Sequence, residues 1–180
     1  ILGPNVFALG AGAVTGRFAS IHLYHYFPPY RKVADTSQYK EGARILEERV
    51  SDFKYMNEEG EYQNCEEIVI SIKATPIPDP RDDAENLCKE LQNKGKNICC
   101  YHIRKKDDRP PEQGNDLILC ALEILTLITK ASQGKKRTHL LLSAHMPLSF
   151  LIGMGLGRFP MTVYYKIGNE ISPVLELDNL

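Results

Sequence analysis

The chain has 180 residues, of which 43% are hydrophobic and 25% are charged, close to the averages for globular domains. This composition argues against a disordered, collagen-like or coiled-coil chain. The formal net charge is −1, which argues against a protein that coats DNA or RNA through a basic face. The longest apolar runs are far shorter than the roughly 20 residues of a membrane-spanning helix, so we expect no membrane segment in this chain.

The first 65 residues predict a small structural unit followed by a polar connection. A helix, a strand, a turn and a second strand are expected within the first 35 residues. Residues 36–65 are polar, and there we expect a linking helix over 39–50 and a hairpin over 53–63.

From Glu66 onward, strands and helices alternate. Short β-branched runs indicate buried strands, and apolar residues spaced three or four apart indicate helices. Alternation of this kind predicts an α/β fold with a Rossmann-like parallel sheet built of right-handed crossovers. The expected strands are 66–73, 97–103, 138–143, 161–165 and 172–177, and the expected helices are 82–93, 117–131 (capped by Asn115 or Asp116) and 146–156.

Ligands of such sheets bind beyond the carboxyl ends of the strands. Four connections should lie at that edge: 75–81, 104–116, 143–147 and the turn after Tyr165. The basic cluster 135–137 precedes a strand, so we expect it at the opposite edge, in contact with solvent or a partner.

Two stretches of the chain match each other, with proline, phenylalanine and glycines at the same spacing. A helix–strand–turn–strand unit therefore occurs twice, and we expect a pseudo-two-fold pair of parallel-sheet units, of which the first is incomplete. The matching segments are 4–12 with 147–155 and, after a two-residue gap, 16–18 with 157–159, 23–24 with 163–164, and 33–35 with 174–176.

These segments resemble a known family, the SAVED domains. The run LLLSAHMPLSFLIG at 140–153, with TVYY at 162–165 and PVLEL at 173–177, is similar to the end of such a domain. GPNVFALG at 3–10 with IHLYHY at 21–26 is similar to the end of its first half. The resemblance covers most of the chain and is weakest over 38–64.

The resemblance implies a domain organisation and a function. It places the remnant of a first CARF-like half at 1–37, a linker helix and hairpin at 38–65, and a second CARF-like half at 66–180. SAVED domains bind cyclic oligonucleotide messengers in the bacterial CBASS and type III CRISPR antiphage systems. We therefore expect a cytoplasmic sensor for a cyclic oligoadenylate or a related ring. It would self-associate on binding and activate a nuclease, TIR or Lon-type protease effector that, like the rest of the first half, lies outside this chain.

A cyclic oligonucleotide offers phosphates and base edges, which helix N-termini, basic side chains and apolar or aromatic faces can bind. The loop before the helix 146–156 and the matching start of the first helix should therefore face the ligand. Asn5 could instead cap its helix, and Arg81 could instead pair with Asp82 or Asp83. The expected ligand-binding residues are Gly3, Pro4, Asn5, Thr75, Pro76, Ile77, Arg81, Arg104, Lys105, Ser143, Ala144, His145, Met146 and Pro147.

Two other functions remain open. One is a nucleotide-processing Rossmann-like enzyme, including a sensor in which Ser143 and His145 align a ribose 2′-hydroxyl and slowly cleave the ring. The other is an assembly module without a ligand. A serine hydrolase is disfavoured because no Gly-x-Ser-x-Gly turn is present, and the glycines at 10–12 and 153–157 lie within helices, where the dinucleotide fingerprint does not belong. We expect no catalytic residues and no cofactor.

The five cysteines, at positions 65, 88, 99, 100 and 120, are scattered and include no Cys-x-x-Cys pair. An odd number in this pattern is typical of reduced cytosolic thiols rather than of disulfides or a zinc site. His22 and His25 offer too few ligands for a metal, so we expect no metal site.

Overall fold

The computed structural model describes residues 4–16, 21–25, 31–36, 49–76, 78–107 and 113–180. The elements, in chain order, are α1 (Pro4–Thr15), β1 (His22–His25), β2 (Arg31–Asp35), β3 (Met56–Gly60), β4 (Glu67–Lys73), α2 (Arg81–Asn93), β5 (Ile98–Lys105), α3 (Asn115–Ser132), β6 (Arg137–Ser143), α4 (Met146–Leu156), β7 (Met161–Ile167), β8 (Glu170–Glu176) and a final 3₁₀ turn (Leu177–Asn179).

Six strands form one mixed sheet in the order β3-β5-β4-β6-β7-β8. The four central strands run parallel, and β3 and β8 pair antiparallel at the two edges. The strands β1 and β2 form a separate antiparallel pair. The predicted α/β class with a Rossmann-like parallel sheet is therefore confirmed, with antiparallel strands added at its edges.

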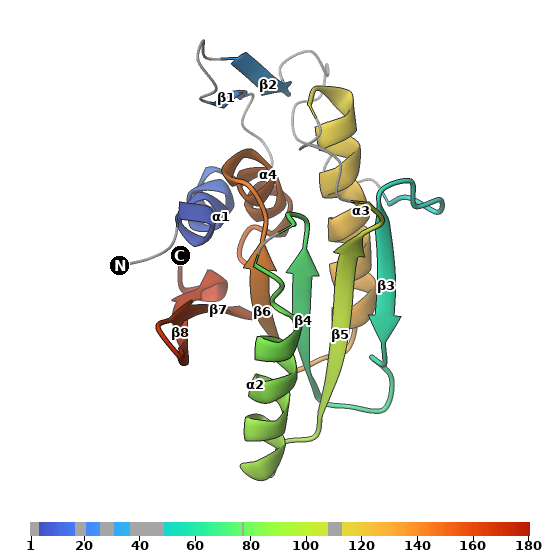
Figure 1. The fold of residues 1–180 in the computed structure, drawn as a ribbon, viewed down its shortest axis with the longest axis vertical. Helices are drawn as coiled ribbons and strands as arrows, with labels where there is room; N and C mark the ends of the chain where they lie inside the picture. Colours follow the sequence, from blue (N-terminus) through green and yellow to red (C-terminus); the bar gives the residue numbers. More distant parts are fainter. Residues whose placement is uncertain (1–3, 17–20, 26–30, 37–48, 77, 108–112) are drawn as a thin grey trace.

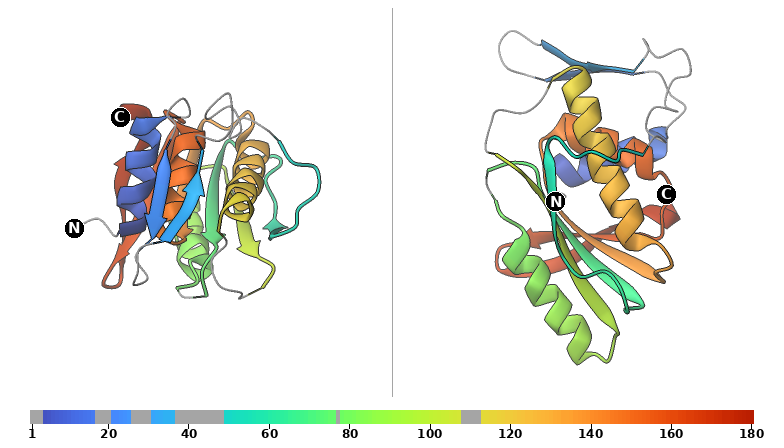
Figure 2. Two further views of the ribbon diagram at one scale, coloured as in Figure 1. Left: turned by 90° about the horizontal axis from the view of Figure 1, so that it is seen from above. Right: turned by 90° about the vertical axis from the view of Figure 1, so that its right-hand side faces the viewer.

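Helices cover both faces of the sheet, which explains why the inner residues of the central strand β4 are mostly apolar on both faces (Figures 1 and 2). The five inner residues of β4 are all buried. Val69 packs with Leu87 and other apolar residues of α2 on one face, whereas Ile70 belongs to the larger core under α3 and α4 on the other face.

A buried carboxylate on α3 fixes the start of β3. Glu123 is fully buried, and its two carboxylate oxygens accept backbone N–H groups of Lys54, Tyr55 and Met56 at 2.8–2.9 Å. Its hydrogen-bonding needs are thus met by backbone donors, as a buried charge requires. This contact leads the chain into β3 and holds that strand beside the sheet.

The hairpin predicted over 53–63 is wrong. A single strand, β3, forms there, and it pairs with β5 rather than folding back on itself.

The predicted cap of α3 is also wrong, because its N-cap is Gly114 and not Asn115 or Asp116. The linking helix predicted over 39–50 lies almost entirely outside the described residues, and the predicted domain boundaries stay a prediction.

The cysteine prediction is wrong for one pair. A disulfide joins Cys65, in the loop before β4, to Cys99 on β5, with Cα atoms 5.8 Å apart. Cys88, Cys100 and Cys120 are free thiols. The two bonded cysteines are 34 residues apart, and only the folding of the chain brings them within disulfide geometry. The expectation of a cytoplasmic location rested in part on all five cysteines being reduced, and the disulfide removes that support.

The internal repeat has a structural counterpart in two helix–strand–strand units, α1-β1-β2 and α4-β7-β8. Each ends in an antiparallel pair with an irregularity at the same place, between Leu23 and Tyr24 in one and between Val163 and Tyr164 in the other. The sequence matched these same residues.

The two helices of the repeat cross closely at two glycines. A Cβ atom added to Gly12 would collide with the carbonyl oxygen of Phe150, and one added to Gly153 would collide with that of Leu9. These reciprocal contacts make Gly12 equivalent to Gly153. The predicted pairing of 4–12 with 147–155, which matched Gly12 to Gly155, is therefore wrong by two residues. With the correct pairing, the two-residue gap assumed after these segments is not needed. Gly16 and Gly157, which both have positive φ and follow the two helices, keep the same offset.

Candidate functional site

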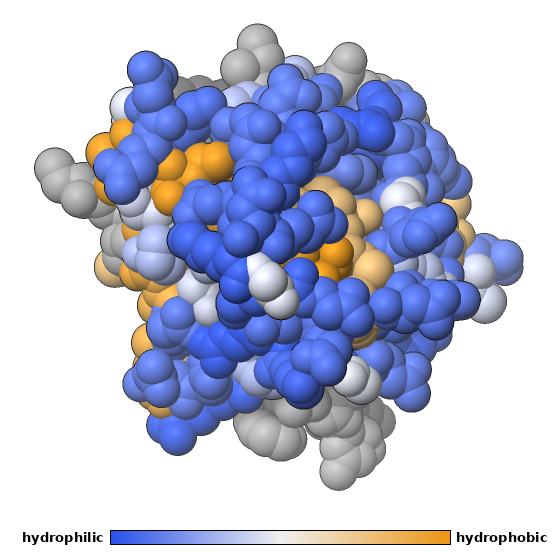
Figure 3. Space-filling view, turned by 90° about the horizontal axis from the view of Figure 1, so that it is seen from below, coloured by the Kyte–Doolittle hydropathy of each residue, from blue (hydrophilic) through white to orange (hydrophobic). Residues whose placement is uncertain are grey.

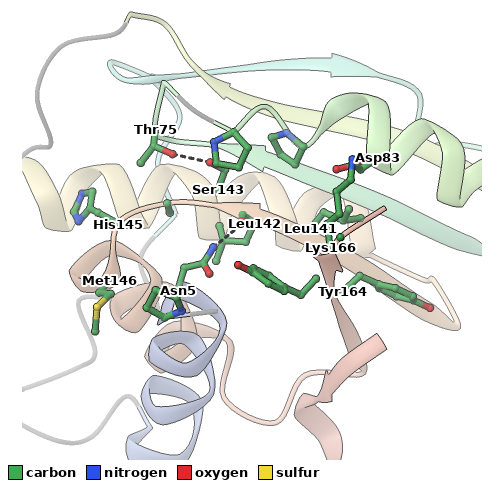
Figure 4. A pocket seen from close by; sticks show the side chains of 16 residues that line it. Asn5, Thr75, Asp83, Leu141, Leu142, Ser143, His145, Met146, Tyr164 and Lys166 are labelled. Atoms are coloured by element: carbon green, nitrogen blue, oxygen red, sulfur yellow. Dashed lines mark hydrogen bonds and ion pairs between the residues drawn. The ribbon is translucent and has the colours of Figure 1, made fainter. Parts of the chain in front are cut away.

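A cavity of about 590 Å³ opens at the carboxyl ends of β4, β6 and β7 (Figure 4). It lies where parallel α/β sheets bind their ligands. Its walls come from the start of α1, the β4–α2 connection, the β6–α4 loop and the end of β7. The residues that line it are Pro4, Asn5, Thr75, Pro78, Pro80, Asp83, Leu141, Leu142, Ser143, Ala144, His145, Met146, Tyr164, Tyr165, Lys166 and Gly168.

The β6–α4 loop forms one wall and is tied to the end of β4. The Ser143 and Thr75 hydroxyl oxygens are 2.6 Å apart, and the Ala74 N–H donates to the Ser143 carbonyl at 2.7 Å. His145 occupies the N-cap of α4 in an extended conformation and, among the described residues, provides no side-chain cap to the helix. The first amides of α4 have no intrahelical partner, and such a helix N-terminus favours an anion.

The start of α1 forms the facing wall. The Asn5 side-chain amide donates to the Leu142 carbonyl at 2.6 Å, and its Oδ1 accepts the Val6 N–H at 3.0 Å. Pro4 is the first residue of the helix, a favourable place for proline. Asn5 therefore lies inside the helix and joins the first repeat to the central strand of the second.

The end of β7 closes a third side. The Lys166 ammonium lies 2.7 Å from the Asp83 carboxylate in the first turn of α2. Tyr164 lines the cavity, but its hydroxyl oxygen lies 3.1 Å from Nδ1 of buried His139, whose Nε2 is 2.8 Å from Glu67. Because a carboxylate only accepts, Nε2 carries the proton and Nδ1 accepts the Tyr164 hydroxyl. Burial lowers the pKa of His139, against the opposing effect of Glu67, and burial raises the pKa of Tyr164.

Basic side chains at this edge are paired with carboxylates. Arg81 contacts Glu85 at 3.1 Å and Glu59 at 2.8 Å, and these two carboxylates raise its pKa. Arg104 also contacts Glu59, at 3.6 Å. Arg81 thus forms ion pairs, as the alternative prediction had it, but with Glu59 and Glu85 instead of Asp82 or Asp83.

The predicted ligand-binding residues are partly brought together. The cavity collects half of them: Pro4, Asn5, Thr75, Ser143, Ala144, His145 and Met146. Pro76, Arg104 and Lys105 line a small recess of about 20 Å³ beside it, together with Thr75. Arg81 lines neither, Pro147 is buried in the first turn of α4, and Gly3 and Ile77 lie outside the described residues.

Sequence reasoning missed the far side of the cavity. Asp83, Tyr164, Tyr165 and Lys166 were not among the predicted ligand-binding residues, although the turn after Tyr165 was expected at this edge. The position of Lys166 at the carboxyl end of a strand was the signal that could have found it.

A shallow depression lies at the opposite edge, at the amino ends of the parallel strands. Its basic side chains are paired: Lys96 with Glu67, Lys136 with Glu66, and Arg137 with Asp178, all at 2.7–2.8 Å. Figure 3 views the molecule from this side and shows a mostly hydrophilic surface with a recessed hydrophobic area. The expected place of the cluster 135–137, away from the cavity, agrees with this arrangement.

Within the described ranges, His, Cys, Asp and Glu side chains form no group of three or more that could hold a metal ion. In the same part of the chain, none of the helices is long and apolar enough to cross a membrane.

Neither a family model nor a curated protein sequence matches the chain. Solved structures do. The Acinetobacter baumannii Cap4 SAVED/CARF-domain receptor with the cyclic trinucleotide 3′3′3′-cAAA superposes with a TM-score of 0.64 at 15% identity, over 96% of this chain and 36% of that chain. The same receptor with 2′3′3′-cAAA superposes with a TM-score of 0.64 at 14% identity, over 96% of this chain and 35% of that chain. The chain thus spans about a third of the length of these receptors, and the likeness establishes its fold.

Proposed function

We propose that this chain, whose fold is that of the SAVED/CARF-domain receptors, is a sensor that binds a cyclic oligonucleotide in the cavity at the carboxyl edge of its sheet. One observation carries the proposal: the two repeats present equivalent helix starts, at Asn5 and at Met146, to a single cavity. A ring with repeated units is a ligand suited to two similar walls. The structural neighbours were solved with cyclic trinucleotides, which supports this ligand class.

The chemistry of the cavity suits such a ligand. Its volume, about 590 Å³, falls within the range of small-molecule sites. The α4 amides and the Lys166 ammonium can bind phosphates, and the proline and tyrosine rings along the walls can pack against bases. We propose a cyclic oligoadenylate or a related ring as the ligand.

The outward face of α1 suggests where the rest of a first unit would pack. Phe7 and Val14, one helical stripe, are 64% and 69% exposed. Their counterparts on α4 are covered: Leu148 is fully buried and Gly155 lies against Leu125 of α3. We propose that an equivalent of α3, from the remainder of the first CARF-like half, covers Phe7 and Val14. Ligand-driven self-association and activation of a linked effector in antiphage defence complete the proposal.

We propose no catalytic step. The Ser143 hydroxyl is engaged with Thr75, and the structural neighbours are receptor domains, which fits a sensor. Chromatography of the ring after hours of incubation checks this: unchanged ligand is expected, and a linear product would establish cleavage.

Thermal unfolding with a panel of cyclic di-, tri- and tetranucleotides tests the proposal. A ring at 100 times its dissociation constant stabilises the folded chain by about 2.7 kcal/mol, which raises Tm by roughly 5–10 °C. A linear trinucleotide of the same composition is the matched control and is expected to give a smaller shift. A panel without any upward shift would remove the proposal.

A further inference from the structure

One ion pair lies at the side of the cavity that the end of β7 closes. Lys166, at the end of β7, and Asp83, in the first turn of α2, both line it, and their charged atoms are 2.7 Å apart (Figure 4). Among the described residues that line this cavity, Lys166 is the only lysine or arginine. Within this described lining, the one ammonium group that a phosphate in the cavity could contact is therefore already bound to a carboxylate.

The pair is accessible and can be displaced. The side chains are 47% exposed for Lys166 and 20% exposed for Asp83. Partly exposed pairs of this kind contribute little, about 0.2–1 kcal/mol, because water and salt screen them. A phosphate can form a charge-assisted bond of at least equal strength with the same ammonium. An anionic ligand can thus take Lys166 from Asp83, and the released carboxylate then opposes the ligand's charge.

We propose that Asp83 is a built-in competitor of the anionic ligand for Lys166, and that it thereby sets the affinity and the selectivity of the cavity. This inference rests on the proposed function. A ring that places a phosphate at Lys166 must displace Asp83 and gains the ammonium. A ring of another size or linkage, whose phosphates lie elsewhere, leaves the Lys166–Asp83 ion pair intact and gains no binding energy from Lys166.

The test compares two neighbouring aspartates in the same helical turn. Asp83→Asn removes the competitor. Asp82→Asn is the matched control, because it makes the same charge change at the same helix end on an exposed residue that is not among those lining the cavity. Titration calorimetry with 3′3′3′-cAAA should give a dissociation constant about two- to five-fold lower for Asp83→Asn than for Asp82→Asn.

A third variant separates competition from a structural effect. If Asp83 acts through Lys166, then Asp83→Asn gives no tightening in a Lys166→Gln background. Equal or weaker binding by Asp83→Asn than by Asp82→Asn, with clear binding by the wild type, overturns the competitor and leaves the proposed function standing. Binding by Asp83→Asn alone supports the competitor. Absence of binding by every form, across the whole ring panel, overturns both.

Discussion

Asn5 is the residue that ties the two repeats together at the cavity. Its amide satisfies the Leu142 carbonyl at 2.6 Å, across 137 residues of sequence. Asn5→Ala leaves that carbonyl without this donor, so we expect the free energy of unfolding to fall by about 1–3 kcal/mol in urea denaturation. Asn5→Asp is not expected to restore stability, because a carboxylate cannot donate. An unchanged urea midpoint for Asn5→Ala would contradict this role.

Two buried histidines make stability depend on pH. Burial lowers the pKa of His139, with Glu67 opposing, and burial followed by the charge of Arg81 lowers that of His102. In the unfolded chain both imidazoles titrate near 6.5. As pH falls below that value the unfolded chain therefore takes up protons first. Their contribution to stability is complete above about pH 6.5 and is lost as pH falls through the lower folded-state pKa values.

We accordingly expect a lower Tm at pH 5.5 than at pH 7.5, measured by thermal unfolding. The double variant His102→Gln/His139→Gln should lose less Tm over the same interval. An equal loss in the variant and the wild type would show that other groups carry the effect. Glu58 and Glu67, whose pKa values lie below their usual range, act at lower pH.

At this scale the sequence predicted loop positions better than side-chain pairings. Ser143 to Met146 could be placed at the cavity because a strand visibly ends and a helix begins there. The pair Lys166–Asp83 joins residues 83 apart in the sequence, and its formation depends on how α2 packs on the sheet. No local pattern encodes that contact.

The crossing of α1 and α4 is the element-scale feature that brings the repeats together. Gly12→Ala and Gly153→Ala each place a Cβ against backbone of the other helix, so we expect a loss of about 1–3 kcal/mol in unfolding free energy. Gly10→Ala is the control, since its Cβ would meet only the Leu175 side chain, at 3.1 Å. Denaturant unfolding measures all three. Equal stability of Gly12→Ala and Gly10→Ala would contradict the close crossing.

The elements from Glu66 onward were predictable because their periodicity is strong and each is long enough to show it. The strand β3 was not, because its residues are largely polar and exposed, and its place depends on Glu123 and on pairing with β5. The repeat was visible in proline, phenylalanine and glycine. Its helical register was misread because each helix contains a Gly-x-Gly pair, but at shifted positions.

For the whole molecule, the central claim is that the two repeats form one cavity for a ring-shaped anion. Composition and charge could only exclude other classes of protein, whereas the repeat predicted two similar walls. The cavity itself could not be predicted from local sequence patterns, because its walls come from segments some 160 residues apart, from Pro4 to Gly168.

Amide NMR of the ¹⁵N-labelled chain titrated with 3′3′3′-cAAA tests this claim most directly. We predict chemical-shift changes that cluster on Asn5, Thr75, Ser143 to Met146, and Lys166, at both walls of the cavity. Changes confined to the amino edge of the sheet around Lys136 and His139, or no changes at saturating ring nucleotide, would contradict it.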